Sequence, residues 1–284
     1  MAAGFNTYAD ITTYVQTIYE DALFAARETG FMSNLVTRFS ADGMAARTGK
    51  EYPKATVSAI GESDDLSSQV WKPSDLSTLT PAEYGAQFFL TDQRLESDPE
   101  GYRADAALEL GTAMGEAINT ALLGNFSSLT GGTVGVAGTV ITWGHFFAMR
   151  SQLKAQKAPG PYVCVMHDYQ WHVLAKAASL AASTQPVPSW LTDTVLMNWY
   201  TATVAGVSIF TTSDISIDTG VDAYCAVFSP AALALDTRRA PRIEPERDAS
   251  RRGWELNLSC VYAHGVWRPK FGVQGIFDAA APTS

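Results

Sequence analysis

The sequence predicts a mixed α+β fold built on a long central helix and long β-ribbons. An Asp-Pro-Glu triplet at 98–100 is a strong helix start, and apolar residues at three- and four-residue spacing follow it to about residue 123. Residues 44–90 are polar, with glycines and prolines separating short β-type runs. Two alternating segments, 233–247 and 253–265, make the last quarter of the chain rich in strand. These observations together predict an α+β fold.

The bulk properties fit a folded chain that does not read nucleic acid. With 284 residues, 46% hydrophobic and 17% charged, the chain can bury a large core in one large or two intimate domains. The formal net charge is −9, whereas neutralising phosphates requires a surplus of lysine and arginine. A protein that only encloses DNA needs no such surplus, so a container is not excluded.

The N-terminal third predicts an arm followed by a projection. Residues 8–28 carry an apolar stripe at helical spacing, and Gly30 follows as a C-cap should. The segment 44–90 is too long and too weakly apolar to be an ordinary loop of a compact domain, so we expect it to have a function. We expect a long hairpin that reaches for a partner outside the chain, with an acidic tip at Glu62, Asp64 and Asp65.

The rest of the chain predicts an α/β subdomain at about 160–228, followed by a ribbon. We expect helices over 98–123, 142–156 and 168–182, and buried strands over 162–166, 205–210 and 223–228. The two long strands of the last quarter are separated by a charged turn at 248–252, and a final strand is expected over 271–277.

A search for chemistry finds no catalytic, metal or cofactor site. The sequence has no P-loop, GxGxxG, HExxH or GxSxG motif. His167 and His172 are five apart and do not share a helix face, so we expect packing roles for them. The cysteines are widely spaced among apolar neighbours and are expected to be buried free thiols: Cys164, Cys225 and Cys260. The two long stretches without charge are too rich in Gly, Thr and Ser to cross a bilayer, and no secretory signal begins the sequence.

The densest charge feature is an arginine cluster interleaved with carboxylates. Its members are Arg238, Arg239, Arg242, Arg247, Arg251 and Arg252. A solvated β-ribbon and a set of ion pairs between subunits are equally compatible with it. A DNA-facing patch is less favoured, because an acidic residue accompanies nearly every arginine. The candidate contacts between subunits are these arginines together with Glu62, Asp64, Asp65 and Lys72.

The order of these parts resembles the major capsid protein of tailed bacteriophages, the Hong Kong 97-type fold. The long helix with its Ala-Leu-Leu-Gly ending at 121–124 is similar to that family's spine helix. The passage 163–172 is similar to the entry of its axial domain, and 228–248 to the return into its peripheral domain. The passage 262–269 resembles its terminal ribbon. The matches follow one another in the family's order over most of 44–278.

The resemblance implies a domain plan and a set of partners. It implies an N-terminal arm (1–43), an extended β-hairpin loop (44–90), a peripheral domain (91–159 and 229–284) with a spine helix at about 99–123, and an axial domain (160–228). The chain would be a structural subunit and not an enzyme, self-assembling into pentamers and hexamers that enclose double-stranded DNA. A portal protein and, because the arm is short, a separate scaffolding protein would be its other partners. Assembly would occur in the host cytoplasm, and the protein would reside in the virion.

One departure from the family and two rival hypotheses complete the prediction. A founding relative joins its subunits through a Lys–Asn bond assisted by Glu. Aligning on Arg268-Pro269 puts Arg252 at the Asn position and Ser259 at the Glu position, so no cross-link is expected despite the loop lysines Lys50, Lys54 and Lys72. An encapsulin-type compartment shell is the first alternative to a phage capsid. An α/β hydrolytic enzyme is a more distant one, and it leaves 44–90 without a role.

Overall fold

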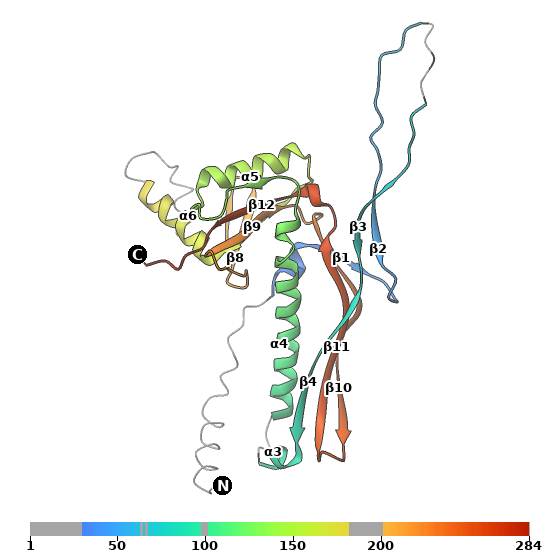
Figure 1. The fold of residues 1–284 in the computed structure, drawn as a ribbon, viewed down its shortest axis with the longest axis vertical. Coiled ribbons are helices and arrows are strands. Elements are labelled where there is room, and N and C mark those ends of the chain that lie inside the picture. Colours follow the sequence, from blue (N-terminus) through green and yellow to red (C-terminus); the bar gives the residue numbers. More distant parts are fainter. Residues whose placement is uncertain (1–29, 63–64, 66–67, 98–101, 182–200, 284) are drawn as a thin grey trace.

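The computed structural model describes residues 30–62, 65, 68–97, 102–181 and 201–283 (Figure 1). The predicted helix 8–28 and the predicted helix start at 98–100 lie outside these residues. The chain forms a long ribbon sheet beside one long helix, a second sheet under two helices, and a hairpin that projects away from both.

The ribbon is a four-stranded sheet in the order β1-β10-β11-β4. Its long strands β10 (Leu233–Asp248) and β11 (Gly253–Val266) are antiparallel and match the two alternating segments predicted for the last quarter. On one side β4 (Ala82–Thr91) pairs antiparallel with β11 over its whole length. On the other side β1 (Thr37–Ser40) pairs parallel with only the first part of β10.

The helix α4 (Tyr102–Leu123) packs along one face of this ribbon (Figure 1). Ala106 and Leu110 are buried as the periodicity predicted, and Met114 and Leu122 continue the buried face, whereas Ala117, predicted on that face, is exposed. On β11 every second residue from 256 to 262 joins the same core. The shared core includes Leu110, Met114, Leu122, Leu256, Leu258, Cys260 and Tyr262. The ribbon is therefore apolar on the face under α4 and more polar on the other, as antiparallel sheets commonly are.

The chain reaches the ribbon by crossing α4. A Cβ at Gly30 would lie 3.1 Å from the carbonyl oxygen of Gly115, which explains a glycine at this crossing. Asn119 is 2% exposed and accepts from the backbone N–H of Met32 at 3.2 Å, while its amide donates to Asp214 at 2.5 Å. A short helix α2 (Met32–Leu35) follows the crossing and leads into β1.

The hairpin is formed by β2 (Arg47–Glu51) and β3 (Ser74–Leu79), which pair antiparallel. The whole segment 44–90 was expected to form it, but residues 82–90 instead belong to β4 in the ribbon sheet. The strand β1 within the predicted arm was not anticipated either. A short helix α3 (Asp92–Ser97) connects β4 toward α4.

The second sheet has six strands in the order β5-β12-β9-β6-β8-β7. They are β5 (Thr133–Val134), β6 (Tyr162–His167), β7 (Thr201–Val204), β8 (Val207–Thr212), β9 (Asp222–Phe228) and β12 (Gly272–Asp278). The strand predicted at 205–210 begins only at Val207, because Ala205 and Gly206 both have positive φ and form the turn from β7. Strand β7 was not predicted. Single 3-10 turns at Phe126–Ser128 and Pro269–Phe271 join these elements to the ribbon side of the molecule.

Helices α5 (Trp143–Ala155) and α6 (Asp168–Ala181) pack against this sheet. Thr142 caps α5 by accepting from the backbone N–H of His145 at 3.3 Å. Along β6, Cys164 and Met166 pack in the core with these helices, whereas Val163 and Val165 join the core of α4 on the opposite face. Burial on both faces explains why 162–166 is an unbroken apolar run in the sequence.

Candidate assembly surfaces

The hairpin beyond β2 and β3 presents large apolar side chains to solvent. They are Tyr52 (49% exposed), Val57 (94%), Ile60 (53%), Val70 (85%) and Trp71 (69%). Tyr52 and Trp71 stack on one another across the two arms, with ring centroids 4.7 Å apart. These side chains stay exposed among the residues that the structure describes, and clustered exposed apolar side chains mark interaction sites.

One side chain holds the two arms together farther out. The amide of Gln69 donates to the carbonyl oxygen of Thr56 at 2.6 Å and accepts from its backbone N–H at 2.9 Å. This clamp takes the place of a strand ladder, because residues 53–62 and 68–73 carry no strand assignment.

The predicted acidic tip lies at the far end of the projection. Glu62 and Asp65 are exposed, and Asp64 lies outside the described residues. Lys72 is also exposed, near the base of the same arms. None of the three described side chains has an ion-pair partner among the residues that the structure describes.

The root of the hairpin is fixed to the top of the ribbon by several contacts. Ser77 donates to the carbonyl oxygen of Trp267 at 2.9 Å, and Lys270 reaches Glu51 at 3.4 Å. A Cβ at Gly49 would lie 3.2 Å from the Trp267 ring, so the backbone passes directly over the indole. Leu79, 1% exposed, anchors β3 in a small core with Ala234 and Ala263.

A buried carboxylate ties the same root to β10. Asp236 is fully buried, and its Oδ2 accepts from Arg47 of β2 at 2.8 Å and from Arg238 at 2.7 Å. Arg47 also lies over the Phe39 ring of β1, 4.6 Å from its centroid. Strands β1, β2 and β10 therefore meet at one carboxylate, a residue that sequence reasoning treated only as a neighbour of the arginine cluster.

Most of the predicted arginine cluster has acidic partners in the same chain. Arg239 pairs with Glu83 across β11, and Arg242 lies 3.3 Å from Glu244. Arg247 binds Asp92 with both guanidinium Nη atoms, one of them at 2.8 Å. This paired hydrogen bond raises the pKa of the Arg247 guanidinium. A role between subunits stays a prediction for these residues.

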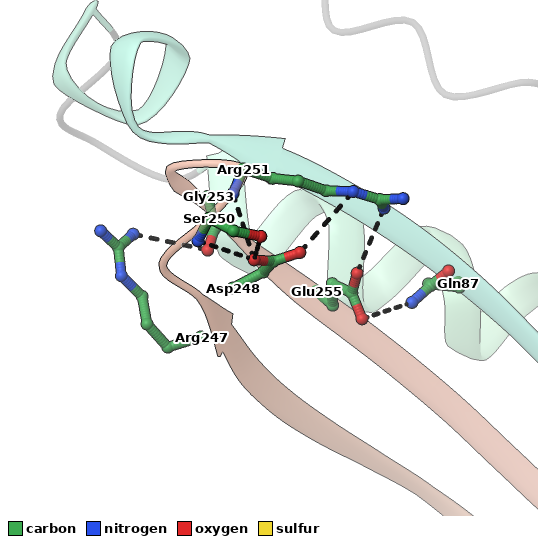
Figure 2. Close-up of polar contacts among 7 residues, drawn as sticks. All are labelled: Gln87, Arg247, Asp248, Ser250, Arg251, Gly253 and Glu255. Carbon is green, nitrogen blue, oxygen red and sulfur yellow. Dashed lines mark hydrogen bonds and ion pairs between the residues drawn. The ribbon is translucent and has the colours of Figure 1, made fainter.

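The turn at the far end of the ribbon is organised by Asp248 (Figure 2). Its Oδ1 accepts from the Ser250 hydroxyl at 2.6 Å and from the backbone N–H of Ser250 at 2.9 Å and of Arg251 at 3.1 Å. The hydrogen bond from Ser250 is the main cause that lowers the pKa of Asp248. Arg251 reaches both Asp248 and Glu255 at 3.6 Å, and Gln87 of β4 donates to Glu255 at 2.8 Å (Figure 2).

Arg252 differs from the other arginines of the cluster. Its φ is +52°, its side chain is exposed, and its backbone carbonyl accepts from the N–H of Asp92 at 3.0 Å. No acceptor for its guanidinium lies in the part of the chain that the structure describes. As far as the described residues go, the turn therefore presents an exposed guanidinium without an acceptor at the end of the ribbon.

The histidine and the cysteines considered in the sequence lie in environments typical of packing residues. His167 Nδ1 accepts from the backbone N–H of Tyr169 at 3.1 Å. The three cysteines are free and buried, as predicted, and burial raises the pKa of each thiol, that of Cys225 to about 12. Among the described residues no group of His, Cys, Asp and Glu is arranged to hold a metal ion. In the same residues, no helix combines the length and the apolar character needed to span a bilayer.

Solved phage structures share this architecture and define the fold. The capsid chain of cyanophage P-SCSP1u matches with a TM-score of 0.70 over 92% of each chain at 12% identity. A chain in the structure of Mycobacterium phage Che8 matches with a TM-score of 0.70 over 96% of this chain and 98% of its own, at 16% identity. The acid-stable capsid of Helicobacter pylori bacteriophage KHP30 matches at 0.71 over 99% and 100%, at 9% identity. The fold is thus the Hong Kong 97-type capsid fold.

The sequence itself identifies the family. The model of a phage capsid protein family matches residues 75–275, and the chain belongs to this family. No curated protein matches the sequence. The chain is a structural subunit of a phage head, which confirms the predicted class of protein. The contacts between subunits and the other partners stay predictions.

Proposed function

We propose that copies of this chain assemble into pentamers and hexamers that close into an icosahedral head around double-stranded DNA, with each hairpin lying on a neighbouring copy. The observation that supports this most is the row of apolar side chains on the hairpin that none of the described residues removes from solvent. A hairpin on one side that meets a different surface of the next copy makes a heterologous contact, and such contacts close into rings when the rotation permits.

The domain plan gives each part of the chain a place in this shell. The arm (1–43) and the extended loop (44–90) would make contacts between subunits. The peripheral domain (91–159 and 229–284) would carry the spine helix α4 and the ribbon, and the axial domain (160–228) would lie at the capsomer centre. In such a shell, stability comes from many repeated contacts, so each interface can be modest.

The expected partners follow from the same role. A separate scaffolding protein would guide assembly in the host cytoplasm, and a portal protein would occupy one vertex. The DNA would be enclosed without sequence-specific binding, because the chain carries a net charge of −9 and phosphate binding needs the opposite sign. The role is structural, and the chain would not act as an enzyme.

Deleting residues 55–70 tests the proposal. The full chain and the deletion variant would be expressed alone and with the scaffolding gene of the same phage, and particles would be scored by negative-stain electron microscopy and size-exclusion chromatography. The deletion should abolish particles while the monomer keeps its unfolding temperature, because these residues lie outside the cores of the body. A deletion variant that still forms closed shells would contradict the proposal.

The absence of a covalent cross-link is tested on the same particles. Boiling in SDS should release monomer, because Arg252 and Ser259 stand where a Lys–Asn bond would need Asn and Glu. A ladder of covalent oligomers would refute this part of the proposal.

A further inference from the structure

The link between β1 and β2 contains a chemically labile pair of residues. Asp42-Gly43 is the only place in the sequence where an Asp or an Asn precedes a Gly. Residues 41–46 carry no strand or helix assignment, and both members of the pair are exposed. In such a pair the main-chain nitrogen of the second residue can attack the side-chain carboxyl carbon of the first and close a five-membered ring. Glycine hinders this attack least, because it has no Cβ and the widest range of backbone conformations.

The surroundings leave both reacting groups open. Gly43 has a φ of +82°, and a Cβ built on it would meet nothing within 4 Å. In the described part of the chain, the Gly43 N–H has no hydrogen-bond acceptor and the Asp42 carboxylate has no donor or cation beside it. No interaction of these residues therefore has to break before the nitrogen reaches the carboxyl carbon.

A fixed positive charge lies at the peptide group that reacts. Nη1 of Arg238 is 3.5 Å from the carbonyl oxygen of Asp42, and its Nη2 is held by the buried carboxylate of Asp236 at 2.7 Å. The Asp42 carbonyl belongs to the same peptide group as the Gly43 nitrogen, so negative charge develops on that oxygen when the nitrogen loses its proton. A cation already positioned at this oxygen stabilises the developing charge.

We propose that Asp42 converts to isoaspartate without an enzyme, through a succinimide ring whose closure Arg238 promotes. The Gly43 nitrogen forms a bond to Cγ of Asp42 and gives up its proton, while the protonated carboxyl group loses its hydroxyl, so that one water leaves. One water then adds to the main-chain carbonyl carbon of Asp42, the bond from this carbon to the Gly43 nitrogen breaks, and the nitrogen regains a proton. The backbone now runs through Cγ, and the former main-chain carbonyl carbon carries a free carboxylate.

The product lengthens a link whose two ends are both fixed. Strand β1 ends at Ser40, which pairs with Thr237 of β10, and β2 begins at Arg47, which binds Asp236. Conversion adds one backbone carbon between these two attachments and leaves the net charge unchanged. The modification therefore alters the root of the hairpin, and it is independent of the assembly proposed above.

Peptide mapping of the full-length folded protein, incubated at mildly acidic pH and 37 °C, tests the inference. Trypsin releases residues 39–47, a peptide whose only acidic residue is Asp42. Isoaspartate is identified in it by electron-transfer fragmentation and by methylation with a protein isoaspartyl methyltransferase. A synthetic peptide of the same sequence, incubated in parallel, gives the rate without Arg238. Asp42→Glu is the matched control, because its side chain cannot close the five-membered ring, and Asp75, which precedes a leucine, is the internal one.

The expected result is isoaspartate at position 42 that accumulates in the folded protein at least as fast as in the synthetic peptide, with none in Asp42→Glu or at Asp75. Arg238→Met should slow the conversion, and its circular dichroism spectrum at 37 °C checks that the variant is still folded. Conversion in the folded protein that is slower than in the synthetic peptide would overturn the inference. An equal rate in a folded Arg238→Met variant would overturn the role of Arg238.

Discussion

Replacing Asp236 should destabilise the protein far more than removing the hairpin arginine that binds it. Asp236→Ala leaves Arg238, whose side chain is only 6% exposed, without its carboxylate. Removing one partner of a buried ion pair costs about 3–5 kcal/mol, because the other charge stays buried without compensation. Arg47 is 30% exposed, and Arg47→Met leaves the pair of Asp236 and Arg238 intact, so about 1 kcal/mol is expected.

These free energies translate into unfolding temperatures that are easy to separate. For a chain of this size each kcal/mol moves the unfolding temperature by about 2–4 °C. Asp236→Ala should therefore lower it by about 6–20 °C, and Arg47→Met by about 2–4 °C. The measurement is thermal unfolding of the monomer followed by circular dichroism at fixed protein concentration and pH.

A third variant separates lost charge from lost packing. In Asp236→Ala/Arg238→Met neither charge is left buried, so this double variant should unfold at a higher temperature than Asp236→Ala alone. Equal shifts for Asp236→Ala and Arg47→Met, or a double variant less stable than the single one, would refute the interpretation of Asp236 as a buried charge held by Arg238.

Three further predictions concern pH, backbone fit and thiol chemistry. Burial lowers the pKa of His264, whose Nδ1 lies 3.1 Å from the amide of Asn125. The neutral ring therefore stabilises the fold above the pKa of the unfolded chain, near 6.5, and this stability is lost as the pH falls from there toward the lower pKa of the folded state. His264→Gln should flatten this loss in unfolding curves recorded between pH 7 and 5. Gly253→Ala should cost about 1–3 kcal/mol in denaturant unfolding, since its Cβ would lie 2.6 Å from the carbonyl oxygen of Leu90, whereas Gly111→Ala, where nothing lies within 4 Å, should not destabilise. The three cysteines should react with a thiol reagent only after unfolding; rapid labelling of the native protein would contradict their burial.

The helices and long strands were predictable because the spacing of their apolar residues follows the face that is buried. Leu110 and Met114 recur at helical spacing and face the ribbon, and Leu256 and Leu258 alternate on β11 as a half-buried strand requires. Residues 82–90 show no comparable alternation, since Phe88 and Phe89 are adjacent and both exposed. Their assignment to the hairpin failed for that reason: which strand pairs with which is set by tertiary contacts.

The candidate site was only partly visible in the sequence. The hairpin and its acidic tip could be inferred from an unusually long polar stretch, and the arginine cluster from its density. The buried position of Asp236 could not, because it depends on cover by β1 and β2 from nearly two hundred residues earlier in the chain. Likewise, Ala205 in the two-residue turn before β8 has a positive φ, and the neighbouring sequence gives no indication of this conformation.

The distribution of contacts along the hairpin is compatible with the proposal that one chain forms both pentamers and hexamers. At the root, Asp236, Trp267 and Leu79 fix β2 and β3 to the ribbon through an ion pair, a hydrogen bond and a small core. Farther out, the Tyr52–Trp71 stack and the Gln69 clamp join the arms without a strand ladder between them in the described residues. Resistance to bending is therefore concentrated at the root, and the outer arms can follow the surface of a neighbour. Because β3 continues directly into β4, which pairs with β11 over its whole length, a load on the arms passes into the ribbon sheet.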